Sequence, residues 1–247
     1  MTTTGARPAA EVAAGLGTLL GVWAHPDDEA YLCGGLMAAA VDAGSRVVCV
    51  TATRGERGTP DPVTWPPARL APVREAELAA SLAVLGVSEH RQLGYPDGGC
   101  AAVRGGEAVD RLAALVAEVG PDTVLTFGPD GVTGHPDHRT VSAWATAAVR
   151  RSGPGCAPRL LYAARTEAWC ERFDPLHGTI GVFPPGLPAR FPAAEVAFEV
   201  VLAGDVLDRK VAALEAQPSQ VTPLVEVLGG DTFRTWVATE CFRPAEQ

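Results

Sequence analysis

Short apolar runs alternate with helix-like segments between residues 16 and 151. Strands are predicted at 16–24, 46–53, 91–93 and 123–127, and helices at 29–43, 73–85, 107–119 and 137–151, with a Gly- and Pro-rich loop at 54–72. This alternation is typical of a parallel sheet whose strands are joined by right-handed helical crossovers. Because ligands bind such sheets beyond the carboxyl ends of the strands, a functional site is expected in the segments that follow them.

The pattern changes after residue 152. Strands are predicted at 160–164, 178–183 and 195–202, joined by proline-rich connections, and helices at 205–216 and 222–228. We therefore predict an α/β fold with a mostly parallel sheet flanked by helices and an elaborated C-terminal third. Residues 1–247 are expected to form one domain, with residues 1–15 as a flexible tail.

Composition argues against several classes of partner. The net charge is −9 and no long basic stripe occurs, so neither a nucleic-acid surface nor an anionic-membrane surface is expected. No apolar run reaches the ~20 residues of a membrane span. The six cysteines show no CxxC spacing, which indicates a reducing cytoplasm. Heavy use of Arg, Ala, Gly and Pro suggests a bacterial source with a GC-rich genome.

The first motif, His25-Pro26-Asp27-Asp28-Glu29, follows directly on the first predicted strand. An ordinary helix start explains the proline and one or two acids, since both suit the positive end of a helix dipole. It does not explain a histidine at a strand end followed by two adjacent aspartates. In the first helical turn His25 and Asp28 can face one point, whereas Asp27 is rotated away. The motif thus predicts two metal ligands with an acid–base group beside them.

The second motif, His135-Pro136-Asp137-His138, follows the strand at 123–127 through a glycine-rich loop at 128–134. Alone, it is equally compatible with a loop histidine followed by a helix-start histidine. Glycine-rich loops after a strand commonly carry binding residues, however. The two motifs together are a stronger signal than either one, because both lie at the carboxyl ends of predicted strands.

Together the motifs supply His25, Asp28 and His138 as nitrogen and oxygen ligands. Three protein ligands with a position left for water are typical of catalytic zinc, although two histidines and one carboxylate also suit Fe(II). Zinc is favoured, with Fe²⁺ or another divalent metal as the alternative, because the neighbouring acid and base groups suit hydrolysis. Asp137 is expected to partner His135, fixing its ring and raising its basicity.

Two other functions remain open on these residues. One is an Fe(II)-dependent oxygenase with the same ligands, in which Asp27 has no evident role. The other is a non-catalytic sugar- or nucleotide-binding module. Against a dinucleotide, no phosphate-binding GxGxxG follows the first strand.

Over nearly its whole length the chain resembles the LmbE-like/PIG-L family of zinc-dependent de-N-acetylases. The matching segments are 24–29, 53–56, 73–78, 96–98, 134–138, 210–214, 219–220 and 240–242. The resemblance implies a Rossmann-like fold and a hydrolase that removes an N-acyl group, most commonly acetyl, from an amino sugar or amino-sugar conjugate. The implied partner is a small molecule, and the oligomeric state, including a homo-oligomer, stays open.

The resemblance also implies a role for each matching residue. It implies one zinc ion per chain, held by His25, Asp28 and His138. It implies a catalytic group made of the general base Asp27, the oxyanion-stabilising His135 and the neighbouring Asp137. The implied substrate contacts are Arg74, Asp97 and Glu56. The chain has Thr133 where some relatives that cleave thiol-glycoside precursors have a tyrosine.

Overall fold

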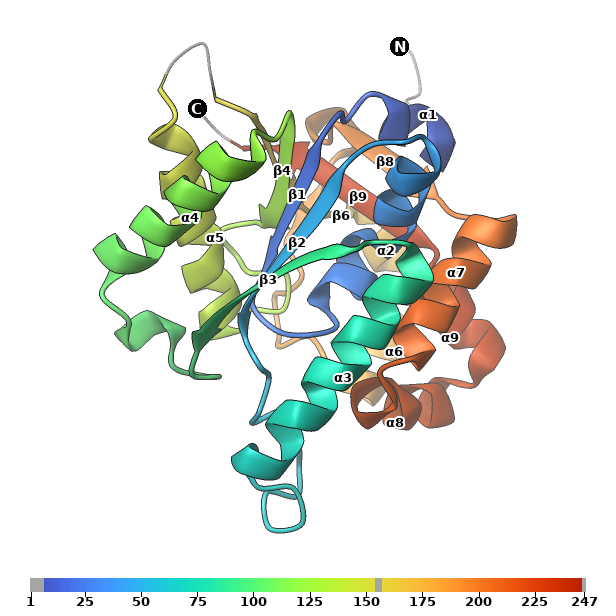
Figure 1. The fold of residues 1–247 in the computed structure, drawn as a ribbon. Coiled ribbons are helices and arrows are strands. Elements are labelled where there is room, and N and C mark those ends of the chain that lie inside the picture. The colour runs from blue at the N-terminus through green and yellow to red at the C-terminus, as the bar shows by residue number, and fades with distance from the viewer. Residues whose placement is uncertain (1–6, 154–156, 246–247) are drawn as a thin grey trace.

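A seven-stranded sheet runs through the centre of the molecule (Figure 1). The computed structural model describes residues 7–153 and 157–245. The strand order is β3-β2-β1-β4-β5-β9-β8. The bounds are β1 Leu19–Trp23, β2 Val47–Thr53, β3 Glu89–Tyr95, β4 Thr123–Phe127, β5 Arg159–Ala163, β8 Phe198–Val201 and β9 Thr239–Pro244. Strands β1 to β5 pair in parallel, and β9 is antiparallel to both of its neighbours. The predicted α/β class with a mostly parallel sheet is confirmed.

Helices cover both faces of this sheet (Figure 1). On one face lie α4 (Gly105–Val119) and α5 (Pro136–Arg150), and on the other lie α2 (Asp28–Asp42), α3 (Pro67–Leu85) and α7 (Gly204–Glu215). A further group, α6 (Glu167–Ile180), α8 (Pro218–Leu228) and α9 (Gly230–Val237), packs against the start of α2 through its own apolar cluster. Strand β1 is buried along its whole length, as expected for a strand covered on both faces.

The direction in which strands are added reverses between β1 and β4. From β1 the chain adds β2 and β3 on one side, whereas β4 and β5 extend the sheet on the other. The crevice at the carboxyl ends of two such strands is the usual ligand site of open α/β sheets. The first motif follows β1 and the second follows β4, so the fold brings both motifs to this crevice.

The C-terminal third differs from its prediction at residues 178–183, which are not a strand. Residues 178–180 are the last turn of α6. Thr166 starts this helix by accepting a hydrogen bond from the backbone N–H of Trp169, and Trp169, Phe173 and His177 then bury one face at helical spacing. The strand prediction is wrong because this packing outweighs the local β propensity of a short apolar run. Helix α9 and strand β9 are not predicted by the sequence pattern either.

The amino-terminal segment is more ordered than a flexible tail. Residues 1–6 lie outside the described part of the chain, but Ala9–Ala14 form helix α1 and Arg7 pairs with Val200 of β8. The tail prediction is wrong for residues 7–15 because Val12 and Ala13 are buried in the core. The loop predicted at 54–72 also ends early, since α3 begins at Pro67.

Helix α2 is kinked at Cys33, whose backbone (φ −148°, ψ 16°) is not helical. The kink frees the N–H groups of residues 35 and 36, which in a regular helix bond to carbonyls four residues earlier. The buried Glu240 carboxylate accepts both of them, at 2.7 and 2.8 Å. The buried Lys210 ammonium donates to Glu240 (2.8 Å) and to the freed carbonyl of Tyr31 (2.9 Å). This ion pair therefore holds the turns that carry the first motif at a fixed angle to the rest of α2.

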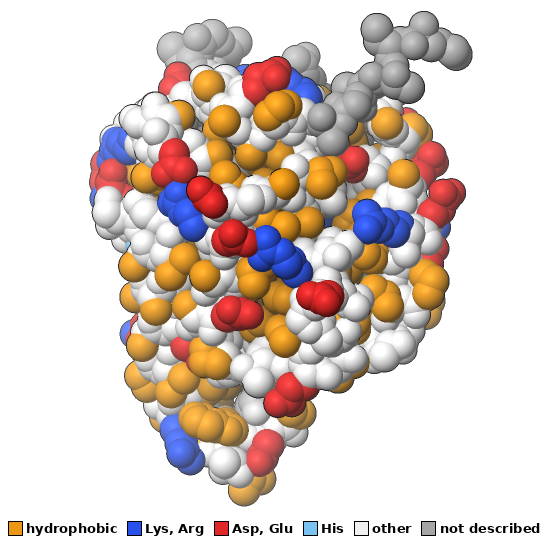
Figure 2. Space-filling model, turned by 90° about the vertical axis from the view of Figure 1, so that its right-hand side faces the viewer, with side chains coloured by type: hydrophobic (Ala, Val, Ile, Leu, Met, Phe, Trp, Pro, Cys, Tyr) orange, Lys and Arg blue, Asp and Glu red, His pale blue; other side chains and the backbone are white. Residues whose placement is uncertain are grey.

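Charged side chains of both signs are interspersed with hydrophobic ones on the side of the molecule where α7 lies (Figure 2). Within residues 7–153 and 157–245, no helix is both long enough and apolar enough to cross a bilayer. The cysteines in these ranges, Cys33, Cys49, Cys100, Cys170 and Cys241, are buried free thiols. No disulfide therefore contributes to the described part of the fold.

Candidate active site and metal centre

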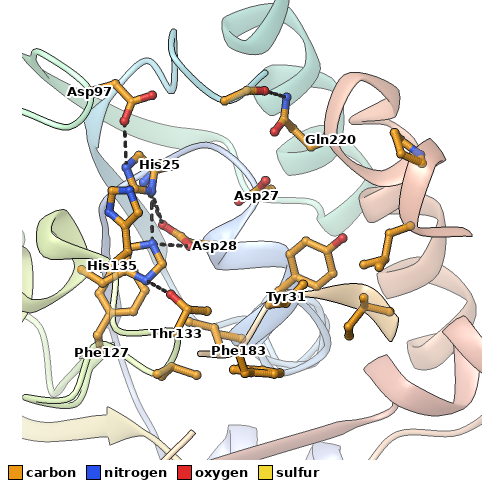
Figure 3. A pocket seen from close by; sticks show the side chains of 18 of the residues that line it. His25, Asp27, Asp28, Tyr31, Asp97, Phe127, Thr133, His135, Phe183 and Gln220 are labelled. Carbon is orange, nitrogen blue, oxygen red and sulfur yellow. Dashed lines mark hydrogen bonds and ion pairs between the residues drawn. The ribbon is translucent and has the colours of Figure 1, made fainter. Parts of the chain in front are cut away.

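Three donor groups from the two motifs converge at the crevice, and two of them, His25 and Asp28, are labelled in Figure 3. Nδ1 of His25 lies 3.1 Å from Nε2 of His138, and the Asp28 carboxylate lies 3.6 Å from the first nitrogen and 3.3 Å from the second. Neighbouring ligands around a tetrahedral zinc ion with bonds of roughly 2.0–2.2 Å are about 3.3 Å apart. The spacing and the set of two nitrogens and one oxygen therefore fit a divalent metal.

His25 is held from its other side by two carboxylates. Its Nε2 lies 3.2 Å from Asp97 and 3.3 Å from Asp137, and Asp137 also accepts the N–H groups of residues 98 and 100, at 2.7 and 3.1 Å. A carboxylate behind a ligating imidazole orients the ring and raises its basicity. Contrary to the prediction, the carboxylate of Asp137 does not bond to the ring of His135, which accepts only the backbone N–H of Asp137. The turn that follows β3 holds the Asp137 carboxylate facing His25 instead.

The carboxylates make this part of the crevice strongly negative. Burial disfavours a charged His25, but hydrogen bonds to Asp137, Asp28 and Asp97 raise its pKa well above the ordinary value. Burial disfavours an ionised Asp28 as well, yet the two histidines lower its pKa. Burial acts to raise the pKa of Asp97, but its hydrogen bond to His25 and the charge of His25 lower this pKa to about 2. Ionised carboxylates around neighbouring imidazoles favour a cation at this position.

His138 is oriented by the loop that precedes it. Its Nδ1 lies 2.9 Å from the carbonyl oxygen of Gly131 and 3.1 Å from Oγ1 of Thr133, and its ring stacks on Phe127. A proton on Nδ1 satisfies the carbonyl and leaves Nε2 free to ligate a metal. A glycine is required at 131, where φ is 73° and a Cβ would lie 3.0 Å from that of His138.

His135 lies beside these ligands, with its ring 4.7 Å from that of His25 and 5.1 Å from that of His138. These three histidines are an alternative ligand set. However, Nδ1 of His135 accepts the backbone N–H of Asp137 at 3.2 Å, which places the ring proton on Nε2. Burial and the charge of His25 lower the pKa of His135. His135 is therefore a neutral imidazole that offers one N–H donor.

Asp27 is adjacent to the ligands but engaged elsewhere. Its φ of 95° is rare for a residue with a side chain and costs about 1–3 kcal/mol. Its carboxylate lies 3.1 Å from the Arg74 guanidinium, and its side chain is 19% exposed. Burial raises the pKa of Asp27 to about 7, although Arg74 acts to lower it. A carboxyl group with this pKa can take up and release a proton near neutral pH.

Arg74, predicted as a substrate contact, is buried and engaged within the protein. It donates to the backbone carbonyls of Gly55 and Pro26 as well as to Asp27. Gly55 allows this approach, because a Cβ at its φ of +62° would lie 2.2 Å from Nη1 of Arg74. Arg74 therefore positions Asp27, and its contact with a substrate stays a prediction.

Asp97 and Glu56 have a similar supporting arrangement. The Asp97 carboxylate faces His25 and accepts the backbone N–H of Arg57 at 2.8 Å. Glu56 accepts the N–H of Asp97 at 2.9 Å and thereby fixes the turn that carries it. Asp97 borders the cavity described next, and its contact with a substrate stays a prediction. Glu56 is not among the residues that line this cavity, and its contact with a substrate stays a prediction as well.

The site forms one wall of a cavity of about 740 Å³ (Figure 3). The rest of the lining is mostly apolar and comes from α2, α8, α9, the end of α6 and the segment that follows it; it includes Tyr31, Ile180, Phe183, Leu224, Val227 and Trp236. Polar side chains that the sequence analysis missed are Arg57, Arg165 and Gln220. Gln220 lies in the matching segment 219–220 but is assigned no role there, whereas no local motif marks Arg57 or Arg165. A cavity of this size has room for a sugar and an attached group.

A family comparison agrees with this geometry. The family model PIG-L, described as GlcNAc-PI de-N-acetylase, matches residues 20–149, more than half of the 247-residue chain. The chain belongs to the PIG-L family. The matched region runs from β1 into α5, so the PIG-L match contains both motifs and the crevice between them.

Two relatives of this PIG-L chain are named 1D-myo-inositol 2-acetamido-2-deoxy-alpha-D-glucopyranoside deacetylase. The protein from Saccharomonospora viridis is 40% identical over 156 residues, 54% of this chain and 58% of the relative. The protein from Actinosynnema mirum is 33% identical over 247 residues, 87% of this chain and 84% of the relative. This chain therefore spans little more than half the length of the first relative.

A solved structure supports the same fold. The conserved protein TT1542 from Thermus thermophilus is 27% identical to this chain, with a TM-score of 0.62. The match covers 94% of this chain and 95% of that protein. The central sheet and its flanking helices are thus shared along almost the whole PIG-L chain.

Proposed function

We propose that this PIG-L protein is a metal-dependent de-N-acetylase, which hydrolyses the N-acetyl group of an amino sugar or amino-sugar conjugate to a free amine and acetate. The observation that carries the proposal is the position of Asp27, a carboxyl group with a pKa of about 7 that lies beside three metal-ligating side chains without joining them. Hydrolysis of an amide needs such a proton carrier. An oxygenase or a non-catalytic binding module gives Asp27 no role.

The proposed metal ligands are His25, Asp28 and His138. Zinc is the favoured ion because its usual ligands include imidazole nitrogen and carboxylate oxygen, and Fe²⁺ is the alternative with the same donors. When bound, zinc supplies Lewis-acid chemistry and makes water more acidic. Asp97 and Asp137 keep Nδ1 of His25 directed at the metal position.

The proposed proton transfers use two groups of this chain. Asp27, held by Arg74, takes a proton from the water that attacks the amide carbonyl and delivers it to the leaving nitrogen as the C–N bond breaks. His135 donates its Nε2–H to the carbonyl oxygen while negative charge develops there. The neutral state of His135 suits this role, because a donor is needed and a second acid is not.

The substrate is proposed to be a small N-acetylated amino-sugar conjugate. In support, the two named relatives are described as deacetylases of a 2-acetamido-2-deoxyglucopyranoside of inositol. The cavity of about 740 Å³ also exceeds what one sugar ring fills. We further propose that the whole chain is one catalytic domain working in the cytoplasm.

A free-amine assay tests the proposal. N-acetylglucosamine, its inositol glycoside and its aryl glycosides are offered to the zinc-loaded protein, to chelated protein and to His138→Ala. The matched control is His90→Ala, since His90 lies on β3 and bonds to Thr51 instead of the site. The wild type and the control should release amine, chelation and His138→Ala should abolish release, and added zinc should restore the wild type. Equal release by verified metal-free protein would contradict the proposal.

A further inference from the structure

The mostly apolar side of the cavity contains a buried cation, Arg165. This residue lies in the two-residue strand β6 (Arg165–Thr166), just before α6, and is only 7% exposed. It lines the same cavity as the metal-ligating side chains. Nothing in the proposed hydrolysis uses a positive charge at this place.

The charge of Arg165 is poorly compensated. Its Nη1 lies 3.5 Å from the carbonyl oxygen of Thr239, at the outer limit of a hydrogen bond, and its Nε is buried without a partner. The ring of Trp169 lies 4.6 Å from the guanidinium carbon and covers one face. Within the described ranges, no carboxylate lies within 4.0 Å of it. Burial accordingly lowers the pKa of Arg165.

Two carboxylates, Glu240 and Glu199, act electrostatically on Arg165, but both are hydrogen-bonded to other groups. Glu240 binds Lys210 and two backbone N–H groups of α2, and Glu199 accepts the hydroxyl of Thr166 at 2.7 Å. A buried ion without a close counter-ion or full hydrogen bonding is costly. The free side of Arg165 is the cavity, so an anion that enters the cavity would meet this need.

Neighbouring indoles offer further unpaired donors. Nε1 of Trp236, which lines the cavity, and Nε1 of Trp169 are both buried without a hydrogen-bond partner. The two rings lie 6.4 Å apart, and one of them covers Arg165. Two residues that line the cavity, Arg165 and Trp236, therefore each have a buried N–H without an acceptor, and Trp169, which packs on Arg165, has a third.

The surroundings of these donors indicate what carries the anion. The cavity lining contributed by α8, α9, the end of α6 and the segment after it includes the apolar side chains of Ile180, Phe183, Leu224, Val227 and Trp236. A free inorganic anion would leave these apolar surfaces exposed to water, whereas an anionic group on an apolar body would cover them.

We propose that Arg165 binds an oxyanion, a carboxylate or a phosphate monoester, on an apolar portion of the substrate. The site would thus select amino-sugar conjugates that carry an anionic apolar group over neutral conjugates of the same shape. That the bound anion is part of a substrate rests on the proposed deacetylation, whereas the binding of an anion at Arg165 does not.

The test separates binding from turnover. Isothermal titration calorimetry of the 247-residue protein, both chelated and zinc-loaded, compares 4-phenylbutyrate, 3-phenylpropyl phosphate and the neutral 4-phenylbutyramide. Charge-assisted hydrogen bonds to a guanidinium predict that at least one anion binds about 10–100-fold more tightly than the amide. The carboxylate and phosphate arms identify the anion. Equal affinity of all three compounds would overturn the proposal, and so would anion binding that needs the metal.

Three variants locate the interaction. Arg165→Met should bring the anions to within about twofold of the amide, while Arg165→Lys should keep part of the preference, because it retains the charge but loses the planar fork. The matched control, Arg172→Met, removes an exposed arginine of α6 that packs on Phe173, and it should bind like the wild type. A full preference in folded Arg165→Met would overturn the proposal. If that variant does not fold, a full preference in Arg165→Lys would do so.

A kinetic arm links the site to the proposed function. The 4-carboxyphenyl and 4-carbamoylphenyl glycosides of N-acetylglucosamine should differ in KM in the wild type and become alike in Arg165→Met. Loss of amine release from every glycoside, with anion binding intact, would refute the deacetylase and leave the Arg165 site standing. Amine release from both glycosides without any preference for the anion would leave the deacetylase standing and refute the Arg165 site.

Discussion

Replacement of Lys210 by methionine should destabilise the protein by about 3–5 kcal/mol, the usual cost of removing one partner from a buried ion pair. Both Lys210 and Glu240 are 0% exposed. The change would leave Glu240 with its two backbone donors but without a counter-ion, and the carbonyl of Tyr31 without its donor. The kink of α2 would lose the contact that holds it.

Urea unfolding followed by circular dichroism measures the change in the free energy of unfolding. In a thermal melt of a chain of this size, 1 kcal/mol corresponds to roughly 2–4 °C in Tm, so the melting temperature should fall by about 6–20 °C. The double variant Lys210→Met/Glu240→Gln should be less destabilised than the sum of its single changes, by about 0.5–3 kcal/mol. Each single change leaves one buried charge without its partner, whereas the double variant removes both charges.

The neighbouring residue Arg209 provides a control. Its ion pair with Asp42 lies near the surface, where such pairs contribute about 0–1 kcal/mol, and its Nη2 also donates to the carbonyl of Leu85, a bond worth about 0.5–1.5 kcal/mol. Arg209→Met should therefore cost clearly less than Lys210→Met. A Lys210→Met protein within about 1 kcal/mol of the wild type would refute this account of the kink, as would strict additivity in the double variant.

Three further predictions concern the site. Arg74→Met should move the acidic limb of the kcat/KM profile to higher pH. Loss of the neighbouring cation raises the pKa of Asp27, and Asp27 acts as a base only when it is ionised. An acidic limb at the same pH in this variant would show that it reports another group. Asp137→Asn should weaken metal binding about 10–100-fold in chelator competition, since it loosens the ring of His25. His135→Ala should lower kcat about 10²–10³-fold with metal content unchanged, and an empty site in this variant would make His135 a ligand.

The convergence of His25, Asp28 and His138 could be predicted because its signals are local. His25 and Asp28 follow one buried strand within six residues, and His138 follows another, so each motif could be placed at a strand end without knowledge of the tertiary structure. The parallel sheet then brings the two ends together. The same local reasoning found the strand at Thr123–Phe127 and the helix that carries His138.

The supporting residues could not be predicted because their partners are distant in sequence. Asp97 reaches His25 only through the pairing of β3 with β2 and the turn beyond it, and the carboxylate of Asp137 faces His25 and not the ring of the nearby His135. Arg165 lies in β6 just before α6, a helix that contains a proline and a glycine and whose last turn the sequence pattern predicts as part of a strand. These features depend on tertiary packing, which a pattern along the chain does not contain.

The most direct test of the central claim is the rate of amine release per bound metal in Asp27→Asn and Asp28→Asn, with metal content measured on the same samples. The exposed loop variant Asp61→Asn serves as the control. We predict that Asp27→Asn keeps its metal and loses about 10²–10⁴-fold in rate, because a positioned base contributes that much. Asp28→Asn should instead lose the metal first. An Asp27→Asn protein that holds metal and retains wild-type turnover would contradict the proposed division between ligand and base.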